Sequence, residues 1–283
     1  DNAGLDYGKA EPVEDVEPQI DRAEELRQKW NVETGQLWQL GDHRLICGDC
    51  TDKGVVGRVM GGERAALCVT SPPYADLRQY DGKPDLSTEL LAAFFDAPAD
   101  LFVVNLGLII RNREIVPYWN AYLEAAASRK LPLLSWNVWD KGNASAPAHQ
   151  QAMFGLCHEW VFVFGKYREL NLTVPNKQAG EGNWGKPTVR EKDGSLSQHS
   201  TAKIRTHRQL DSVFRLQALK NYDGDYTGHP AQFPLAFAST YIEAASNSGD
   251  VCIEPFSGSG TTLIACEQLG RRCRAVEISP AYV

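Results

Sequence analysis

Short apolar runs alternate with helical segments along this chain of 283 residues, and that alternation restricts the fold more than any other feature. Strand-like runs occupy 43–49, 65–73, 101–110, 131–141, 158–166, 250–256 and 271–279, and helix-like segments occupy 21–30, 118–130, 233–246 and 258–270. Strands that alternate with helices form a mainly parallel sheet with helices on both faces. The expected fold class is therefore α/β, with a doubly wound, mostly parallel sheet.

The composition is that of an ordinary globular protein, with 43% hydrophobic and 23% charged residues, which excludes collagen, coiled coils and wholesale disorder. No run of 18 apolar residues occurs, so no membrane-spanning helix is expected. The seven cysteines are an odd number, lie mostly in apolar runs and follow no export signal, which favours a reducing compartment. Cys47 and Cys50 form a single C-x-x-C pair with no second pair at zinc spacing, so no metal is expected.

Charge is distributed unevenly, although the net charge is -7. Residues 1–35 contain ten acidic and four basic residues, whereas residues 166–229 contain eleven basic and seven acidic residues. A local basic region can contact phosphates even when the whole chain is acidic. The chain divides into an acidic linker and helix, two halves of one α/β domain, and a polar insert between the halves. The acidic linker and helix cover 1–35, the two halves of the α/β domain cover 36–169 and 229–283, and the insert covers 170–228.

A glycine-rich segment, FSGSGTT at 256–262, follows one predicted strand and opens a predicted helix. Glycines at such a point allow a sharp turn and a close approach of the backbone to a ligand. Glu277 ends the next predicted strand, about 20 residues on, where nucleotide-binding folds carry the acid for ribose hydroxyls. The glycine spacing is not G-x-G-x-x-G, so a dinucleotide is disfavoured. A tight strand-to-helix turn without a ligand explains this motif, taken alone, equally well.

A second segment, TSPPY at 70–74, ends the predicted strand 65–73. Its two prolines fix the backbone and carry no N–H donor, so the preceding carbonyls are free to accept hydrogen bonds. Tyr74 then offers an aromatic face beside the Ser71 hydroxyl and the Pro72 carbonyl. A planar base with an exocyclic amine can stack on such a ring and donate to these oxygens. A proline-rich turn without a ligand is the alternative interpretation.

Together, the two segments resemble those of S-adenosylmethionine-dependent DNA amino-methyltransferases of the permuted, or beta, arrangement. In that family the catalytic tetrapeptide [DNS]-P-P-[YFW] comes early and the methionine-binding F-x-G-x-G comes late. Residues 71–74 and 256–260 match these motifs in that order. The resemblance covers roughly residues 40–283, apart from 170–228. It implies a Rossmann-like methyltransferase fold of the seven-stranded type and an enzyme that methylates the exocyclic amine of a base flipped out of DNA.

The resemblance also implies roles for individual residues. The catalytic residues would be Ser71, Pro72, Pro73 and Tyr74. The residues that bind S-adenosylmethionine would come from four segments: Asp49, Cys50, His229, Pro230, Phe233, Glu254, Phe256, Ser257, Gly258, Ser259, Gly260, Thr261 and Glu277. On this reading 36–169 is the catalytic half, 229–283 the cofactor-binding half and 170–228 a target-recognition insert.

The target base is inferred from Ser71. In the resembling family Ser-Pro-Pro usually accompanies methylation of cytosine N4, and Asp or Asn usually accompanies adenine N6. Cytosine is therefore favoured, and adenine stays open. Methylation at carbon 5 of cytosine would need a thiolate, typically in a Pro-Cys dipeptide, and no proline here is followed by Cys, which disfavours covalent catalysis. Glu254 departs from the family, which commonly has Asp at this point.

Contacts with double-stranded DNA are expected from basic residues in the insert and after the catalytic segment: Arg78, Lys203, Arg205, Arg208 and Arg215. A solvated basic loop is the alternative for them. A non-catalytic DNA-binding module is the alternative of another functional class. The enzyme is expected in the cytoplasm of a bacterium, encoded by the host or by a phage, with restriction-modification as one role. The sequence leaves the oligomeric state open, with a dimer as one alternative.

Overall fold

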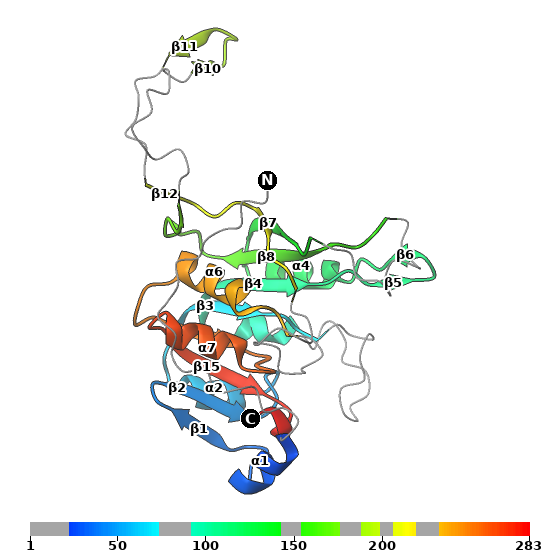
Figure 1. Ribbon diagram of the computed structural model, residues 1–283, viewed down its shortest axis with the longest axis vertical. Coiled ribbons are helices and arrows are strands. Elements are labelled where there is room, and N and C mark those ends of the chain that lie inside the picture. The colour runs from blue at the N-terminus through cyan, green and yellow to red at the C-terminus, as the bar shows by residue number, and fades with distance from the viewer. Residues whose placement is uncertain (1–22, 74–91, 143–153, 176–187, 199–205, 219–231) are drawn as a thin grey trace.

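One nine-stranded sheet forms the centre of the computed structural model, which describes residues 23–73, 92–142, 154–175, 188–198, 206–218 and 232–283 (Figure 1). The strand order across this sheet is β1-β2-β15-β14-β3-β4-β8-β7-β13. Listed in that order, the strands are Leu37–Leu40, His43–Cys47, Arg272–Glu277, Val251–Glu254, Ala65–Thr70, Ala99–Leu106, His158–Gly165, Leu133–Asp140 and Val213–Arg215.

Five neighbouring strands, β2, β15, β14, β3 and β4, run parallel. β8 is antiparallel to both of its neighbours, β4 and β7, and β13 pairs with β7 in parallel. β1 pairs with β2 in antiparallel fashion at the other edge of the sheet. The predicted α/β fold with a mostly parallel sheet is therefore confirmed, and β1 and β13 flank the seven strands between them.

Helices cover both faces of the sheet (Figure 1). α6 and α7 lie on the face toward the viewer, and α2, α4 and the 3-10 helix η2 lie behind it. Their bounds are Lys53–Met60 for α2, Ala92–Asp96 for η2, Trp119–Ser128 for α4, Leu235–Ala245 for α6 and Thr261–Gln268 for α7. The remaining helices, α1 (Ala23–Trp30) and η3 (Pro280–Tyr282), contact each other.

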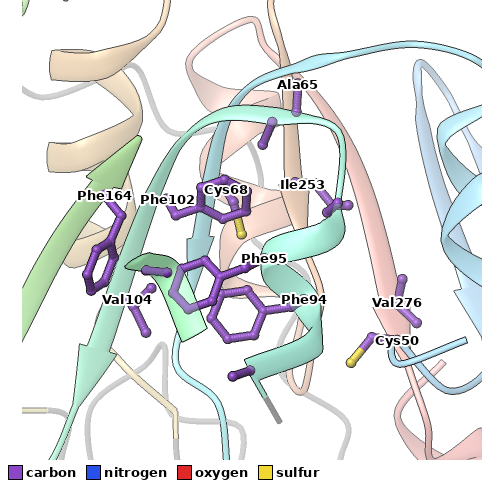
Figure 2. Packing of buried hydrophobic residues seen from close by; sticks show 14 of the residues in the cluster. Cys50, Ala65, Cys68, Phe94, Phe95, Phe102, Val104, Phe164, Ile253 and Val276 are labelled. Carbon is purple, nitrogen blue, oxygen red and sulfur yellow. The ribbon is translucent and has the colours of Figure 1, made fainter. Parts of the chain in front are cut away.

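The period-two alternation of strand side chains separates the buried residues into two clusters, one on each face. In β3, Leu67 and Val69 pack with α6 and α7, whereas Cys68 packs with α2, η2 and α4. Figure 2 shows Phe94 and Phe95 of η2 beside Phe102 of β4. The Phe95 and Phe102 ring centroids are 5.3 Å apart in a T-shaped arrangement. Apolar burial on both faces explains why the predicted strands read as continuous apolar runs.

The boundaries of several elements differ from those expected. The strand predicted over 65–73 ends at Thr70, because the prolines that follow have no N–H for a sheet ladder. The helix predicted from 258 begins at Thr261, after two glycines with left-handed backbone. The sequence did not predict α2, which begins after Asp52, whose carboxylate accepts the Gly54 N–H.

The part between β8 and α6 contributes short pieces. β9 (Val174–Pro175) pairs with β12 (His207–Arg208), and β10 (Thr188–Arg190) pairs with β11 (Leu196–Gln198). A further hairpin, β5 (Ile110–Arg111) with β6 (Glu114–Ile115), follows β4. Strand β13 joins this part of the chain to the central sheet through β7. Among the residues described, no helix is both long and apolar enough to cross a membrane.

Candidate active site

The carboxyl ends of the parallel strands bring the two predicted motifs to one edge of the sheet. Ser71 follows the end of β3, and the glycine turn 256–260 follows the end of β14. These two strands are hydrogen-bonded neighbours, with Ile253 in register with Cys68. The crevice beyond the carboxyl ends of such strands is the usual ligand site of open α/β sheets. Ser71 and Phe256, which lie 185 positions apart in the sequence, thus follow neighbouring strands at one edge of the sheet.

The glycine turn has the backbone that its sequence predicts. Gly258 and Gly260 have φ angles of 53° and 77°, in the left-handed region where glycine has no steric penalty. The Ser257 N–H bonds the Val276 carbonyl at 2.9 Å, which anchors the turn on β15. A Cβ added to Gly260 would meet nothing within 4 Å, and Gly260 caps α7 without a side-chain hydrogen bond. The turn therefore offers open space and an uncapped helix start, which suit a close ligand.

Glu277, at the end of β15, faces this turn. Its Oε2 accepts the Gly258 N–H at 2.7 Å, and its Oε1 accepts the Ser279 N–H at 2.8 Å. Glu277 is 7% exposed. This burial raises the pKa of its carboxyl above the usual value, although the two backbone hydrogen bonds oppose the rise. A carboxylate oxygen has two lone pairs. Each oxygen can therefore also accept from a hydroxyl, as a ribose would require.

Asp49 and Cys50 follow β2, the next strand along the same edge. Asp49 Oδ1 accepts both the N–H and the hydroxyl of Thr51, at 2.9 and 2.7 Å. The Gly48 N–H bonds the Glu277 carbonyl at 2.8 Å, which ties this loop to β15. Cys50 is buried, and desolvation raises the pKa of its thiol, so it packs as a neutral group.

Glu254 is the last residue of β14, and the structure turns its side chain into the protein. Oε1 accepts the Thr70 hydroxyl at 2.6 Å and the Phe256 N–H at 3.0 Å, and Oε2 accepts the Thr262 hydroxyl at 2.9 Å. Burial raises the pKa of Glu254 to about 8, the three hydrogen bonds oppose this, and Glu277 raises it further. The Phe256 ring packs edge-on against Phe94, with centroids 6.0 Å apart.

The predicted catalytic segment, 71–74, is described as far as Pro73. Ser71 and Pro73 are half-buried and Pro72 is buried. Tyr74 lies outside the described residues. So do five other predicted site residues: Arg78, Lys203, Arg205, His229 and Pro230.

Phe233 precedes α6 and is half-buried, with its ring 5.2 Å from that of Phe237. α6 packs on β3 and leads through a short turn into β14. A helix connected to its strand in this way runs antiparallel to it, so the start of α6 lies toward the carboxyl edge. Phe233 is therefore on the side of the sheet where the glycine turn lies.

Two of the predicted DNA contacts are described, and each pairs with a carboxylate. Arg215, at the end of β13, bonds Asp140 Oδ2 through Nε and Nη2, both at 2.8 Å. Arg208 pairs with Asp211, three residues on. Because β7 and β13 run parallel to β4, Arg215 lies at the same edge as Ser71. Four strand spacings separate them, roughly 20 Å.

The sequence analysis missed Thr70 and Thr262, which hold the Glu254 carboxylate. Thr70 directly precedes the Ser-Pro-Pro segment, and Thr262 ends the FSGSGTT segment. The only sign of these two residues in the sequence is a threonine hydroxyl at the border of each motif. The sequence does not indicate that both hydroxyls bind the same carboxylate. Among the described residues, no group of three His, Cys, Asp or Glu side chains is placed to hold a metal ion.

The mostly parallel sheet with helices on both faces is the Rossmann-like fold of S-adenosylmethionine-dependent methyltransferases. A family model for N6 and N4 methyltransferases, described as DNA methylase, matches residues 65–283, and the chain belongs to this family. Its members transfer a methyl group from S-adenosylmethionine to an exocyclic amine in DNA, so the predicted enzyme class and cofactor are confirmed.

Individual relatives are distant. The orphan methyltransferase M.BamHII of Bacillus amyloliquefaciens is 27% identical over 233 residues, 76% of this chain and 84% of its own length. The solved structure of the PvuII cytosine-N4-specific DNA methyltransferase superposes with a TM-score of 0.60 at 15% identity, over 88% of this chain and 87% of its own. The structure of the M1.HpyAVI–SAM complex superposes with a TM-score of 0.53 at 17% identity, over 84% of this chain and 94% of its own. At these identities the solved structures support the fold.

Proposed function

We propose that this enzyme methylates the N4 amine of cytosine in double-stranded DNA, with the base flipped into the crevice between β3 and β14. The observation that carries the proposal is the adjacency of the Ser71 segment and the glycine turn at one sheet edge. Bound S-adenosylmethionine supplies an electrophilic methyl group on a positively charged sulfur.

In this proposal the glycine turn, Glu277 and Asp49 hold the cofactor. Glu277 accepts the ribose hydroxyls, because its buried carboxylate has lone pairs left beside the Gly258 and Ser279 bonds. The uncapped start of α7 faces the polar end of the cofactor. Phe233, with His229 and Pro230, lines the methionine end, as the resemblance implies.

The Ser71 hydroxyl and the Pro72 carbonyl act on the base. An exocyclic amine is a weak nucleophile because its lone pair is delocalised into the ring. Hydrogen bonds from the amine to these two oxygens draw the nitrogen toward a tetrahedral geometry, in which the lone pair can attack. Holding the amine in line with the methyl group makes the step effectively unimolecular, which supplies up to ~7–11 kcal/mol. Tyr74 stacks on the flipped base and offsets the few kcal/mol of unstacking.

The choice of cytosine rests on Ser71. A hydroxyl accepts less strongly from the amine than a carboxylate would, and it can also donate. Adenine N6 is the second candidate at the same site, because its amine can make the same two hydrogen bonds. The name of the PvuII enzyme, cytosine-N4-specific, also favours cytosine as the target.

Arg208 and Arg215, with Arg78, Lys203 and Arg205, are proposed to contact phosphates around the flipped base. Support comes from the place of Arg215 at the catalytic edge and from the basic character of 166–229. A phosphate can replace the half-buried Asp140 or the exposed Asp211 as the partner of each arginine. We propose a bacterial cytoplasmic enzyme of restriction-modification type. A dimer is one alternative for its assembly.

The test is methyl transfer from labelled S-adenosylmethionine to duplex DNA, followed by digestion and identification of the modified nucleoside. Detection of N4-methylcytosine supports the proposal. Detection of N6-methyladenine would mean that adenine is the target base and that the same site methylates it. No labelled nucleoside from any duplex, in a protein that binds the cofactor, would refute DNA as the substrate. Ser71→Ala should lower the rate and leave cofactor affinity unchanged, since its hydroxyl serves the base alone.

A further inference from the structure

The buried carboxyl of Glu254 is the one described group that touches the catalytic segment, the glycine turn and helix α7 together. Thr70, its first partner, directly precedes Ser71. Phe256, its second, begins the glycine turn. Thr262, its third, lies in the first turn of α7. All three bonds are 2.6–3.0 Å long, and Glu254 is 1% exposed.

We propose that Glu254 is a positioning residue, which sets the separation between the amine held at Ser71 and the methyl donor held by the glycine turn. This inference rests on the proposed function. Two facts of geometry carry it. The carboxyl bonds both sides: Oε1 accepts from Thr70 of β3 and from the Phe256 N–H of the glycine turn, and Oε2 accepts from Thr262 of α7. The carboxyl is also too deeply buried for its bonds to be exchanged for water.

The chemistry makes this separation matter. Transfer of a methyl group between two held partners depends steeply on alignment, and a misplacement of about 1 Å can cost about 100-fold in rate. The ladder between β3 and β14 pairs only Leu67 with Cys252 and Cys68 with Ile253. Beyond that pairing, the Thr70–Glu254 bond is the described side-chain link between the two strand ends.

The two threonines allow separate tests of the two sides. Thr70→Val removes the hydroxyl on the catalytic side and keeps the shape of the side chain. Thr262→Val does the same on the cofactor side. We expect Thr70→Val to lower kcat by about 10- to 100-fold, with the KM for S-adenosylmethionine within about threefold of wild type. We expect Thr262→Val to raise that KM more than it lowers kcat.

Conservative variants and a distant control separate positioning from stability. Thr70→Ser keeps a hydroxyl and should restore most of the rate. Glu63→Gln is the matched control, because Glu63 is a partly buried carboxylate bonded by Arg272 and Arg274 near the opposite end of the sheet. It should lower the melting temperature and leave kcat and KM unchanged.

The groups that face Glu254 are Glu277 of β15, Cys50 after β2 and Cys68 of β3. They are common to all these variants, so pH profiles of kcat compare directly. The proposal is overturned if Thr70→Val melts earlier but keeps the wild-type kcat, or if both threonine variants change kcat and KM in the same proportion. Wild-type protein that binds cofactor without methylating DNA would instead refute the proposed function.

Discussion

Replacing Glu277 by Gln tests the cofactor site most directly. The carboxylate accepts one backbone N–H on each oxygen and, in the proposed complex, ribose hydroxyls on its remaining lone pairs. A glutamine amide of the same shape places an NH2 group against either Gly258 or Ser279. One of the two backbone N–H groups then loses its acceptor, and the ribose loses a charged partner.

The magnitude follows from these counts. A hydrogen bond to a charged group contributes about 1.5–3 kcal/mol. Loss of the charged partner of the ribose should therefore weaken the Kd for S-adenosylmethionine by about 1.5–3 kcal/mol, roughly 10- to 160-fold. The unpaired backbone N–H burdens the free and the bound protein alike, so it lowers stability rather than affinity. Isothermal titration calorimetry measures the change in Kd without requiring activity.

Glu267→Gln is the control for this experiment, because Glu267 lies on α7, is largely exposed and bonds His43 away from the glycine turn. Its Kd should stay within about twofold of wild type. The wild-type affinity should also weaken as the pH falls through the raised pKa of Glu277, since protonation removes the acceptor. A Glu277→Gln variant that binds cofactor as tightly as wild type would refute the ribose role.

Four further outcomes are expected. Since burial raises the pKa of Glu254 to about 8, the native state binds more protons than the unfolded chain between about pH 4.5 and 8. The contribution of Glu254 to the free energy of unfolding therefore falls as the pH rises, by up to ~1.4 kcal/mol per pH unit. Glu254→Gln should make the free energy of unfolding, measured by chemical denaturation, less dependent on pH in this range. An equal pH dependence in variant and wild type would contradict this. Arg215→Ala should reduce the salt slope of DNA binding by about one, and Arg64→Ala, which breaks a similar exposed pair with Asp100 near the start of β3, should not. Tyr74→Ala should keep cofactor affinity and lose most turnover, and an unchanged rate would exclude stacking. Phe95→Ala should cost about 3–5 kcal/mol by urea denaturation, against almost nothing for the exposed Phe154→Ala.

Much of the fold was predictable because buried parallel strands leave a direct signal in the sequence. The central residues of such runs, 251–253 and 160–164, are apolar without alternation, since helices cover both faces of the sheet. Prolines and glycines marked where these runs end, as at Pro72 and Gly258. The glycine turn and Glu277 were found for the same reason: both depend on spacing along the chain.

The contacts that escaped prediction join residues far apart in the chain. Thr70 meets Glu254 across two strands that 180 residues separate, and no local pattern records which strands become neighbours. Strand β13 was missed because three residues, Val213–Arg215, are too few to show a period of two. β13 pairs with the edge of β7, and three residues carry too little pattern to predict that pairing.

The order of the two motifs along the chain does not determine whether they lie side by side in the sheet. A methyl donor and an acceptor meet wherever two parallel neighbouring strands end, because their carboxyl ends share one edge whichever strand comes first. Here β3 precedes β14 by some 180 residues and still lies beside it. β3, which precedes the Ser-Pro-Pro segment, and β14, which precedes the glycine turn, share no loop. Their alignment comes from the backbone ladder between them and, beyond its last pair, from side chains such as the Glu254 carboxyl, which is bonded to both sides.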